Sequence, residues 1–308
     1  MRQPVRPPAV AGSFYPQEPR RLAAELKTLL EQALPPLGAR PIALVVPHAG
    51  FAFSGLIAAD AWRQTQGHHY DLVVLLGTNH TAGFFTGISV FLGSGFRTPL
   101  GVVQVDEHAA SSLLAADHDC SSDPAPHERE HSIEVQLPFV QTVLPGVPIL
   151  PVIVSDEDPH LCARLGVALA NVLAGRRALI VASTDLSHFP SYEDAAAADR
   201  AVLTAMAGLD PDGLLETIAR EQGARRRGLD TCTCGLAPVL AALAAARTLG
   251  ATRGTVLSHA SSGDTPPGDR ARVVGYGAVL FTAGEPGTDL AALDEPAHVL
   301  HPAPRSRR

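Results

Sequence analysis

The stretch PIALVVPHAG at residues 41–50 decides the fold. Its first part, Pro41–Val46, is a short apolar run that is rich in β-branched side chains and has no helical period, which predicts a buried strand. A loop with His48 and Gly50 follows, and a helical pattern of apolar residues returns at Gly55–Trp62. The sequence therefore predicts a strand, a loop and a helix in direct succession.

The same order of strand and polar loop occurs twice more. DLVVLLGTNH at residues 71–80 and ALIVASTDLSH at residues 178–188 each begin with a buried strand and end in a loop, which carries His80 or His188. Apolar strands that alternate with helices imply a mostly parallel or mixed sheet with helices on both faces. We therefore expect an α/β fold.

The remaining elements follow from the same patterns. Further helices are expected at Arg20–Leu34, Asp106–Ala116, His131–Leu144, Pro159–Leu173, Ala195–Ala207, Asp212–Arg220 and from Cys234 through Ala246, and further strands at Ile149–Val154, Thr255–His259 and Val273–Phe281. Ile88–Leu92 and Val102–Val105 flank the turn-rich Gly93–Gly101 and are expected to form an antiparallel pair. The polar segment Ser121–Glu130 contains two prolines, which predicts a loop.

One domain is expected over residues 1–283. The chain has 308 residues, of which 46% are hydrophobic, and this is enough to bury a large core. Beyond Ala283 the composition turns to Pro, Gly, Ala and charged residues. This change predicts a mobile tail over residues 284–308.

Composition excludes several classes of protein. The formal net charge is −7 without a long run of either sign, so we expect no nucleic-acid partner, because phosphate binding needs a concentrated basic surface. The sequence shows neither a signal peptide nor an uninterrupted apolar stretch of about 18 residues. We therefore expect that the protein is neither secreted nor inserted into a membrane. The four cysteines are too few for a disulfide framework in a chain of this length. Reduced thiols and a cytoplasmic location are expected.

Three of the predicted strands end in a loop with a histidine. Ligands of open α/β sheets bind beyond the carboxyl ends of the strands, where such loops converge. A single histidine there is more often a structural residue, but His48, His80 and His188 together favour a site that could bind Zn, Fe or Cu. Asp185 and His188 are three positions apart, so on one helical turn they would face the same side and could transfer protons as a pair.

Cys234 precedes Gly235 at the start of the predicted buried helix. The positive end of a helix dipole stabilises a thiolate, which could ligate a metal or act as a nucleophile. The alternative is a buried, inert cysteine, the usual state of this residue. Cys232 and Cys234 do not form a CxxC motif, so neither a zinc ribbon nor a thioredoxin-like site is indicated.

Other polar residues surround these positions in the sequence. Glu130, His131 and Glu134 could be further ligands or substrate contacts, or they could form an acidic helix start that the dipole favours. Asn79 and Ser183 follow the strands directly and could supply oriented donors and acceptors to a substrate.

Seven blocks of the sequence together resemble the MEMO family, whose bacterial and archaeal members are called AmmeMemoRadiSam system protein B. The blocks are RPPAVAGSFYP (Arg6–Pro16), PHAGFAFSG (Pro47–Gly55), GTNH (Gly77–His80), EHSIEVQLPF (Glu130–Phe139), STDLSHF (Ser183–Phe189), CGLAP (Cys234–Pro238) and VVGYGAVLF (Val273–Phe281). They occur in order over nearly the whole chain, which argues against chance agreement.

The resemblance implies a single three-layer domain similar in fold to class III, LigB-type extradiol dioxygenases, which cleave catechol rings with non-haem iron. It places the metal pocket at His48, His80 and Cys234, and the acid/base pair at Asp185 and His188. The dioxygenases use two histidines and a glutamate, and here a cysteine replaces that carboxylate. This softer donor set suits copper at least as well as iron, and it also suits zinc.

The chain departs from the family pattern at Phe51 and Phe53, where tyrosines are common. The resemblance places these positions near the substrate, so we expect Phe51 among the substrate contacts, with fewer hydroxyl groups than in relatives.

Three hypotheses for function follow. The first is a metal-dependent, dioxygenase-like redox enzyme that acts on an unknown small molecule. The second is an enzyme without metal, in which Cys234 is the nucleophile and His188 or His48 the base. The third is a non-enzymatic module that binds a partner or peptide, or carries metal, since eukaryotic relatives resemble a phosphotyrosine-peptide adaptor. The family's naming also implies a radical-SAM protein and an AMMECR-type protein as partners.

Overall fold

A nine-stranded mixed sheet forms the centre of the computed structural model, which describes residues 5–266, 269–295 and 297–298. Its four central strands are parallel neighbours, in the order β1 (Ala43–Val46), β8 (Ala178–Ser183), β2 (Leu72–Gly77) and β7 (Ile149–Val154). Next to β1 lie β10 (Gly275–Thr282), β9 (Arg253–Ser261) and β11 (Gly287–Asp289), and next to β7 lie β3 (Ile88–Val90) and β6 (Cys120–Ser121). β10, β9 and β3 introduce antiparallel pairs, so the predicted mixed sheet is confirmed.

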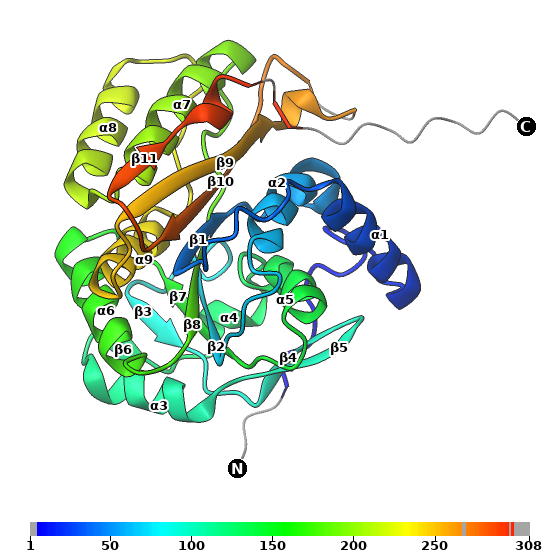
Figure 1. Cartoon of the computed structure of the whole chain (residues 1–308), viewed down its shortest axis with the longest axis vertical. Helices are drawn as coiled ribbons and strands as arrows, with labels where there is room; N and C mark the ends of the chain where they lie inside the picture. Colours follow the sequence, from blue (N-terminus) through cyan, green and yellow to red (C-terminus); the bar gives the residue numbers. More distant parts are fainter. Residues whose placement is uncertain (1–4, 267–268, 296, 299–308) are drawn as a thin grey trace, which may run out of the picture.

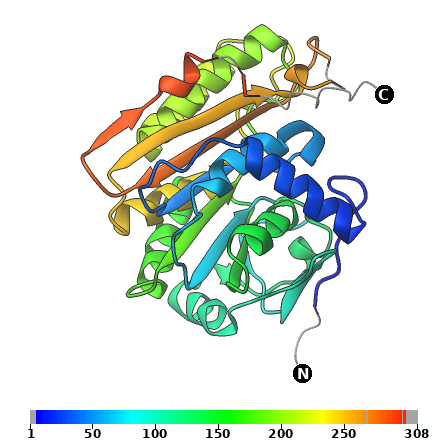
Figure 2. The same cartoon turned by 45° about the vertical axis from the view of Figure 1, so that its right-hand side comes forward.

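Helices cover both faces of the sheet, as predicted (Figures 1 and 2). One face packs against α3 (Glu107–Ala116), α6 (Pro159–Val172), α7 (Tyr192–Ala207), α8 (Pro211–Gly223) and α9 (Leu236–Thr248), and the other against α1 (Pro19–Gln32), α2 (Phe51–Arg63) and α5 (Leu137–Val143). Alternate residues of β1 serve the two layers, because Ala43 and Val45 join one apolar cluster while Leu44 and Val46 join the other. This alternation is the period of a strand whose two faces are both buried.

The expected antiparallel pair of Ile88–Leu92 and Val102–Val105 is wrong. β3 pairs with β7 and β6 instead, and β5 (Gly101–Gln104) forms a hairpin with β4 (Gly95–Thr98). The glycines of this region suggested a turn, but Phe96 and Thr98 are buried while Arg97 between them is exposed. That alternation is the period of a strand.

Three further boundaries differ from the predictions. The expected loop Ser121–Glu130 contains a short helix, α4 (Ala125–Glu128), and the expected helix from His131 is a 3-10 turn (Glu134–Gln136) followed by α5. Part of the expected tail is packed on the domain, because β11 pairs with β9 and Leu293 is buried. Residues 296 and 299–308 of that tail lie outside the described residues.

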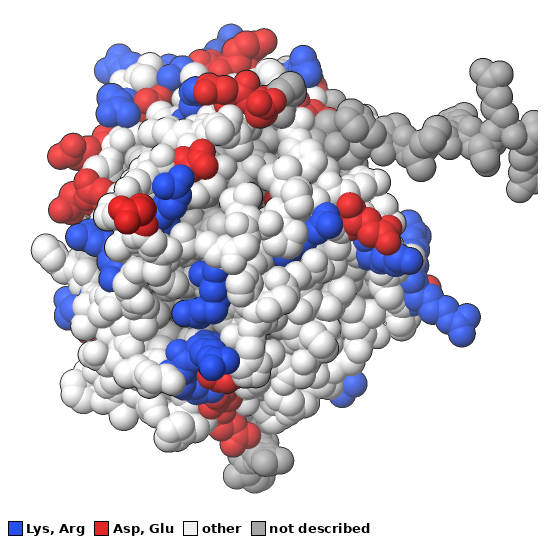
Figure 3. All heavy atoms as spheres, viewed as in Figure 1, with Lys and Arg blue, Asp and Glu red and all other residues white. Residues whose placement is uncertain are grey.

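The surface and the helices bear on the expected partners. In the described part of the chain, no helix is both long and apolar enough to cross a bilayer. On the face shown in Figure 3, acidic and basic side chains are interspersed around a mostly uncharged surface. Arg226, in the run Arg225–Arg227, forms ion pairs with Glu221 and Asp194. That nucleic acid is not a partner stays a prediction.

Candidate metal centre

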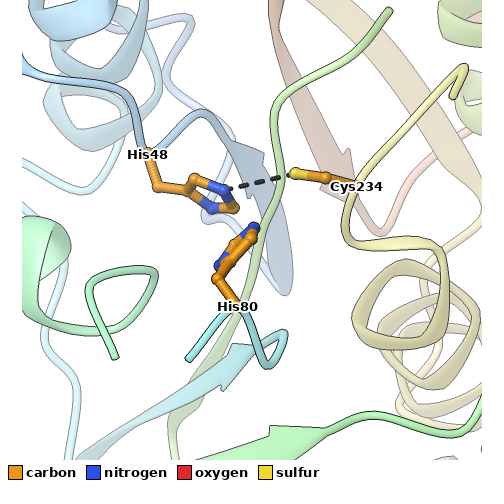
Figure 4. Close-up of side chains that lie close together, drawn as sticks. All are labelled: His48, His80 and Cys234. Carbon is orange, nitrogen blue, oxygen red and sulfur yellow. Dashed lines mark hydrogen bonds between the residues drawn. The ribbon is translucent and has the colours of Figure 1, made fainter. Parts of the chain in front are cut away.

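The three neighbouring strands β1, β8 and β2 direct their carboxyl ends to the same edge of the sheet. His48 follows β1 by two positions, and His80 follows β2 by three. Cys234 reaches this edge from the loop before α9. Figure 4 shows the three side chains pointing toward one another from these separate segments.

The ligand atoms of His48, His80 and Cys234 lie within 4.8 Å of one another. The Sγ of Cys234 is 3.3 Å from the Nε2 of His48, and the rings of His48 and His80 are nearly perpendicular, with centroids 5.1 Å apart. His48 is buried, and the other two side chains are partly exposed. Two imidazoles and a thiol therefore converge on a space that one ion could occupy.

Glu130 orients His80. Its Oε1 accepts a hydrogen bond from the Nδ1 of His80 at 2.8 Å, and its Oε2 accepts one from the His80 backbone N–H at 2.6 Å. Burial alone would raise the pKa of Glu130, but the hydrogen bond from His80 and the charges of His80 and His131 bring this pKa to about 2. A carboxylate only accepts, so Nδ1 of His80 carries the proton and Nε2 keeps its lone pair for a metal.

His80, Glu130 and His131 form a second group whose ligand atoms are close enough for a metal. Glu130 also accepts the backbone N–H groups of His131 and Ser132, both at 2.9 Å, so its oxygens are already engaged. Burial lowers the pKa of His131 to about 4, and its neutral ring lies against Phe14 at 5.0 Å and His80 at 4.5 Å. Glu130 and His131 therefore support the group of His48, His80 and Cys234 from one side and are not themselves assigned as ligands.

The thiol of Cys234 is held in its protonated form. Burial, followed by the charge of Asp185, raises the pKa of Cys234 to about 12, although the backbone N–H of Asp185 donates to Sγ at 3.3 Å. The expected stabilisation of a thiolate by the dipole of α9 is therefore wrong for the metal-free chain. The loss of hydration outweighs the field of a helix that begins only at Leu236.

Asp185 and His188 do not form the expected pair on a helical turn, because the residues between them are not helical. Asp185 Oδ1 accepts the backbone N–H groups of His48 at 2.7 Å and Ala49 at 3.3 Å, and burial raises the pKa of Asp185 to about 6. The Nδ1 of His188 bonds the carbonyl of Leu186 at 2.9 Å. Asp185 thus fixes the backbone of the candidate ligand His48, and the Nε2 of His188 is left to accept a proton.

The family model described as Memo-like protein matches residues 6–280 of this chain. The chain belongs to the Memo-like family. It is 34% identical to a MEMO1 family protein of Methanopyrus kandleri, covering 91% of this chain and 99% of that protein, and 36% identical to one of Aquifex aeolicus, covering 90% and 99%. The predicted family membership is confirmed.

A solved structure also resembles the fold of this Memo-like protein. It is an uncharacterized protein of Escherichia coli K12, with 14% sequence identity, a TM-score of 0.49, and coverage of 80% of this chain and 100% of that chain. This likeness is too distant to carry an argument about function.

The remaining predicted site residues of this Memo-like chain have varied surroundings. Asn79 shapes the loop after β2. Its amide nitrogen donates to the carbonyl oxygen of Ala82, and its amide oxygen accepts the backbone N–H of Ala82. Ser183 lies beneath His48, with its Oγ 3.0 Å from the Nδ1 of that ring. Phe51 is 1% exposed and packs against Tyr15 and Phe139, so it has almost no surface to offer a substrate.

Sequence reasoning did not single out Gln136 or Arg6, which both lie next to residues of the centre. Gln136 bonds Ser183, and Arg6 bonds the backbone carbonyl of Glu130. Both residues stand inside the blocks that carry the family resemblance, and this was the available signal.

Asp199 of α7 anchors the loop between Asp185 and His188, because its Oδ1 accepts the backbone N–H of Ser187 at 2.9 Å. Burial raises the pKa of Asp199 to about 7. A carboxyl whose pKa is raised by folding stabilises the fold at low pH, and this contribution is lost as the pH rises through the folded-state pKa. We expect the free energy of unfolding of wild type to fall, relative to Asp199→Asn, as the pH rises from 3.8 to about 7. Urea unfolding at successive pH values measures this difference, and parallel profiles would refute it.

Gly235 allows Cys234 to approach the sheet. A Cβ at this position would lie 2.7 Å from the carbonyl oxygen of Ser183 and 2.7 Å from the Cβ of Thr184. We expect Gly235→Ala to lower the free energy of unfolding by roughly 1–3 kcal/mol, as overpacking does. Gly223→Ala is the matched control, because a Cβ there would meet nothing within 4 Å. Equal chemical denaturation midpoints for the two variants would contradict the expected clash.

Proposed function

We propose that this Memo-like chain is a metal-dependent redox enzyme that holds copper or iron between His48, His80 and Cys234 and acts on a small molecule. The observation that carries the proposal is the convergence of three ligand atoms within 4.8 Å of one another at the carboxyl edge of a parallel sheet. A bound copper or iron ion would supply one-electron chemistry and would polarise a ligand oxygen.

The donor set fits such a metal. Imidazole suits copper, iron and zinc, and thiolate adds a preference for the softer copper(I) and zinc. The structural carboxylate Glu130 stands behind His80 rather than in the ligand set, which is the usual place of a carboxylate that raises the basicity of a metal-binding imidazole. Because a metal needs the thiolate, binding must release the proton of Cys234.

Other residues of the chain would orient the two imidazoles, accept a proton and contact the substrate. Asp185 holds the backbone of His48, and Glu130 holds the ring of His80, so both imidazoles are fixed before a ligand arrives. His188 donates its Nδ1–H to a carbonyl, which leaves its Nε2 as the proton acceptor at the edge of the centre. His131 and Phe14 form a partly apolar wall on which a planar substrate could lie.

The 3.3 Å contact between Cys234 and His48 also has the geometry of a cysteine–histidine pair for nucleophilic catalysis. The pKa values of both residues argue against nucleophilic catalysis. Burial raises the pKa of the thiol to about 12, and burial, with the charge of His80, lowers the pKa of His48 well below its ordinary value. A neutral thiol beside a neutral imidazole is a weak nucleophile, whereas a bound metal ion would stabilise the thiolate form of Cys234. A radical-SAM protein and an AMMECR-type protein remain proposed partners.

Anaerobic metal loading tests the proposal. Purified protein is incubated with copper(I), iron(II) or zinc, passed through a desalting column and assayed for metal. We expect about one equivalent of copper or iron per chain, and much less for His48→Ala. Copper-loaded protein exposed to air should give a copper(II) electron paramagnetic resonance signal that ascorbate removes. Retention of zinc alone, or equal metal content in wild type and His48→Ala, would overturn the proposal.

A further inference from the structure

The Nδ1 of His48, on the side of the ring away from the centre, meets a hydroxyl group rather than a carboxylate. It lies 3.0 Å from the Oγ of Ser183. That hydroxyl has a single hydrogen, and it donates this hydrogen to the carbonyl oxygen of Ser132 at 2.6 Å. Ser183 can therefore only accept from His48. The proton of His48 must then sit on Nδ1.

Gln136 supplies the second bond that holds this arrangement. Trp62 determines the orientation of the Gln136 amide. The indole Nε1–H of Trp62 can only donate, so the Gln136 atom 2.9 Å from it must be the oxygen Oε1. The amide nitrogen then donates to the Oγ of Ser183 at 3.0 Å and to the carbonyl oxygen of Pro47 at 2.9 Å. One amide group therefore ties down both the hydroxyl partner of His48 and the backbone just before it.

No exposed surface lets water replace these bonds. The exposed fractions of Trp62, Ser132 and Gln136 are all 0%, and that of Ser183 is 1%. Any other placement of the hydrogens leaves a buried donor or acceptor without a partner, which is unfavourable because the group has lost its hydration. The network thus has a single arrangement in which every group is satisfied.

We infer that Ser183 fixes His48 as the tautomer protonated on Nδ1, and that Gln136 is the positioning residue that holds Ser183 and the His48 backbone in place. This tautomer directs the lone pair of Nε2 toward Cys234, where the proposed metal would bind. The role of the tautomer therefore rests on the proposed function. His80 reaches the same tautomer through Glu130. The centre therefore has one imidazole backed by a charged group and one backed by a neutral network.

The tautomer is measured on metal-free protein. Long-range proton–nitrogen spectra of protein labelled with 15N-histidine distinguish the two tautomers, and His48→Gln identifies the signal. We expect wild-type His48 to show Nδ1–H. In Ser183→Ala the acceptor is gone, so we expect a shift toward Nε2–H, with the sulfur of Cys234 as the new acceptor. Ser258→Ala is the matched control, because that buried hydroxyl has no hydrogen-bond partner among the described residues.

Copper(I) affinity gives the second measurement. We expect Ser183→Ala and Gln136→Met each to weaken copper(I) binding about 10–100-fold, as removal of groups behind a metal ligand does, and Ser258→Ala to leave it unchanged. Thermal unfolding checks that each variant is folded. An Nε2–H signal in wild type, or an unchanged tautomer in folded Ser183→Ala, would overturn the inference. Failure of wild type to bind copper or iron would instead overturn the proposed function and leave the tautomer result standing.

Discussion

Replacing Cys234 by serine is expected to weaken copper(I) binding by more than about 100-fold. Loss of a group that only supports a ligand typically costs 10–100-fold, and loss of the ligand itself should exceed that. Serine keeps the size of the side chain but offers a hard hydroxyl oxygen in place of a soft sulfur. Competition with a chromophoric copper(I) chelator under anaerobic conditions measures the change.

Cys120→Ser is the control for this substitution. Cys120 is a free, partly exposed cysteine on β6, and it does not belong to either group of candidate ligands. We expect its copper(I) affinity to equal that of wild type. If Cys234→Ser and Cys120→Ser bind copper(I) equally well, the sulfur is not a ligand and the centre is at most a pair of imidazoles.

Replacing Glu134 by glutamine is expected to lower the free energy of unfolding by about 3–5 kcal/mol, the range found when one partner of a buried ion pair is removed. Glu134 forms such an ion pair with Arg6. The side chain of Glu134 is 0% exposed and that of Arg6 is 4% exposed, so neither charge is hydrated. The same carboxylate accepts the backbone N–H of Ala9 at 2.7 Å and the hydroxyl of Tyr15 at 2.6 Å. Urea denaturation measures the loss.

Two further variants separate this pair from ordinary surface charges. Arg6→Met combined with Glu134→Gln removes both charges and keeps an amide oxygen as an acceptor for the N-terminal segment, so we expect it to be less destabilising than Glu134→Gln alone. Glu31→Gln breaks an exposed pair with Lys27, where we expect a change below about 0.5 kcal/mol. Equal effects of Glu134→Gln and Glu31→Gln would show that the buried carboxylate is not the anchor of the N-terminal segment. The N-terminal segment includes Phe14, whose ring packs against His131. Release of this segment should therefore also remove the Phe14 side of the wall beside the candidate metal centre.

Local patterns were sufficient for the parallel part of the sheet. The apolar runs that became β1, β2 and β8 have a clear strand character, and the rule that ligands gather at strand ends placed His48 and His80 together. β4 was missed because glycine and proline signals outweighed a short alternation of buried and exposed residues. Turn residues are a statistical guide, and the burial of Phe96 overrides it.

The site was only partly predictable for a different reason. The spacing of Asp185 and His188 indicated a pair only if the segment were helical, and β-bridges from His188 to Thr231 and Val274 keep it extended. Arg6 and Glu134 are 128 positions apart, and no local pattern links them. Hydrogen-bond networks such as that of Gln136 depend on how layers pack, which the period of a sequence does not contain.

The wide spacing of the proposed metal ligands has a consequence for biosynthesis. His48 and Cys234 are 186 positions apart, and at roughly 5–20 residues per second a ribosome needs about 10–40 s to make the chain between them. For most of that interval the nascent polypeptide has both imidazoles but not yet the thiol of Cys234. For the proposed copper site, we expect tight capture to follow release from the ribosome, so the supply of copper to finished chains would control maturation.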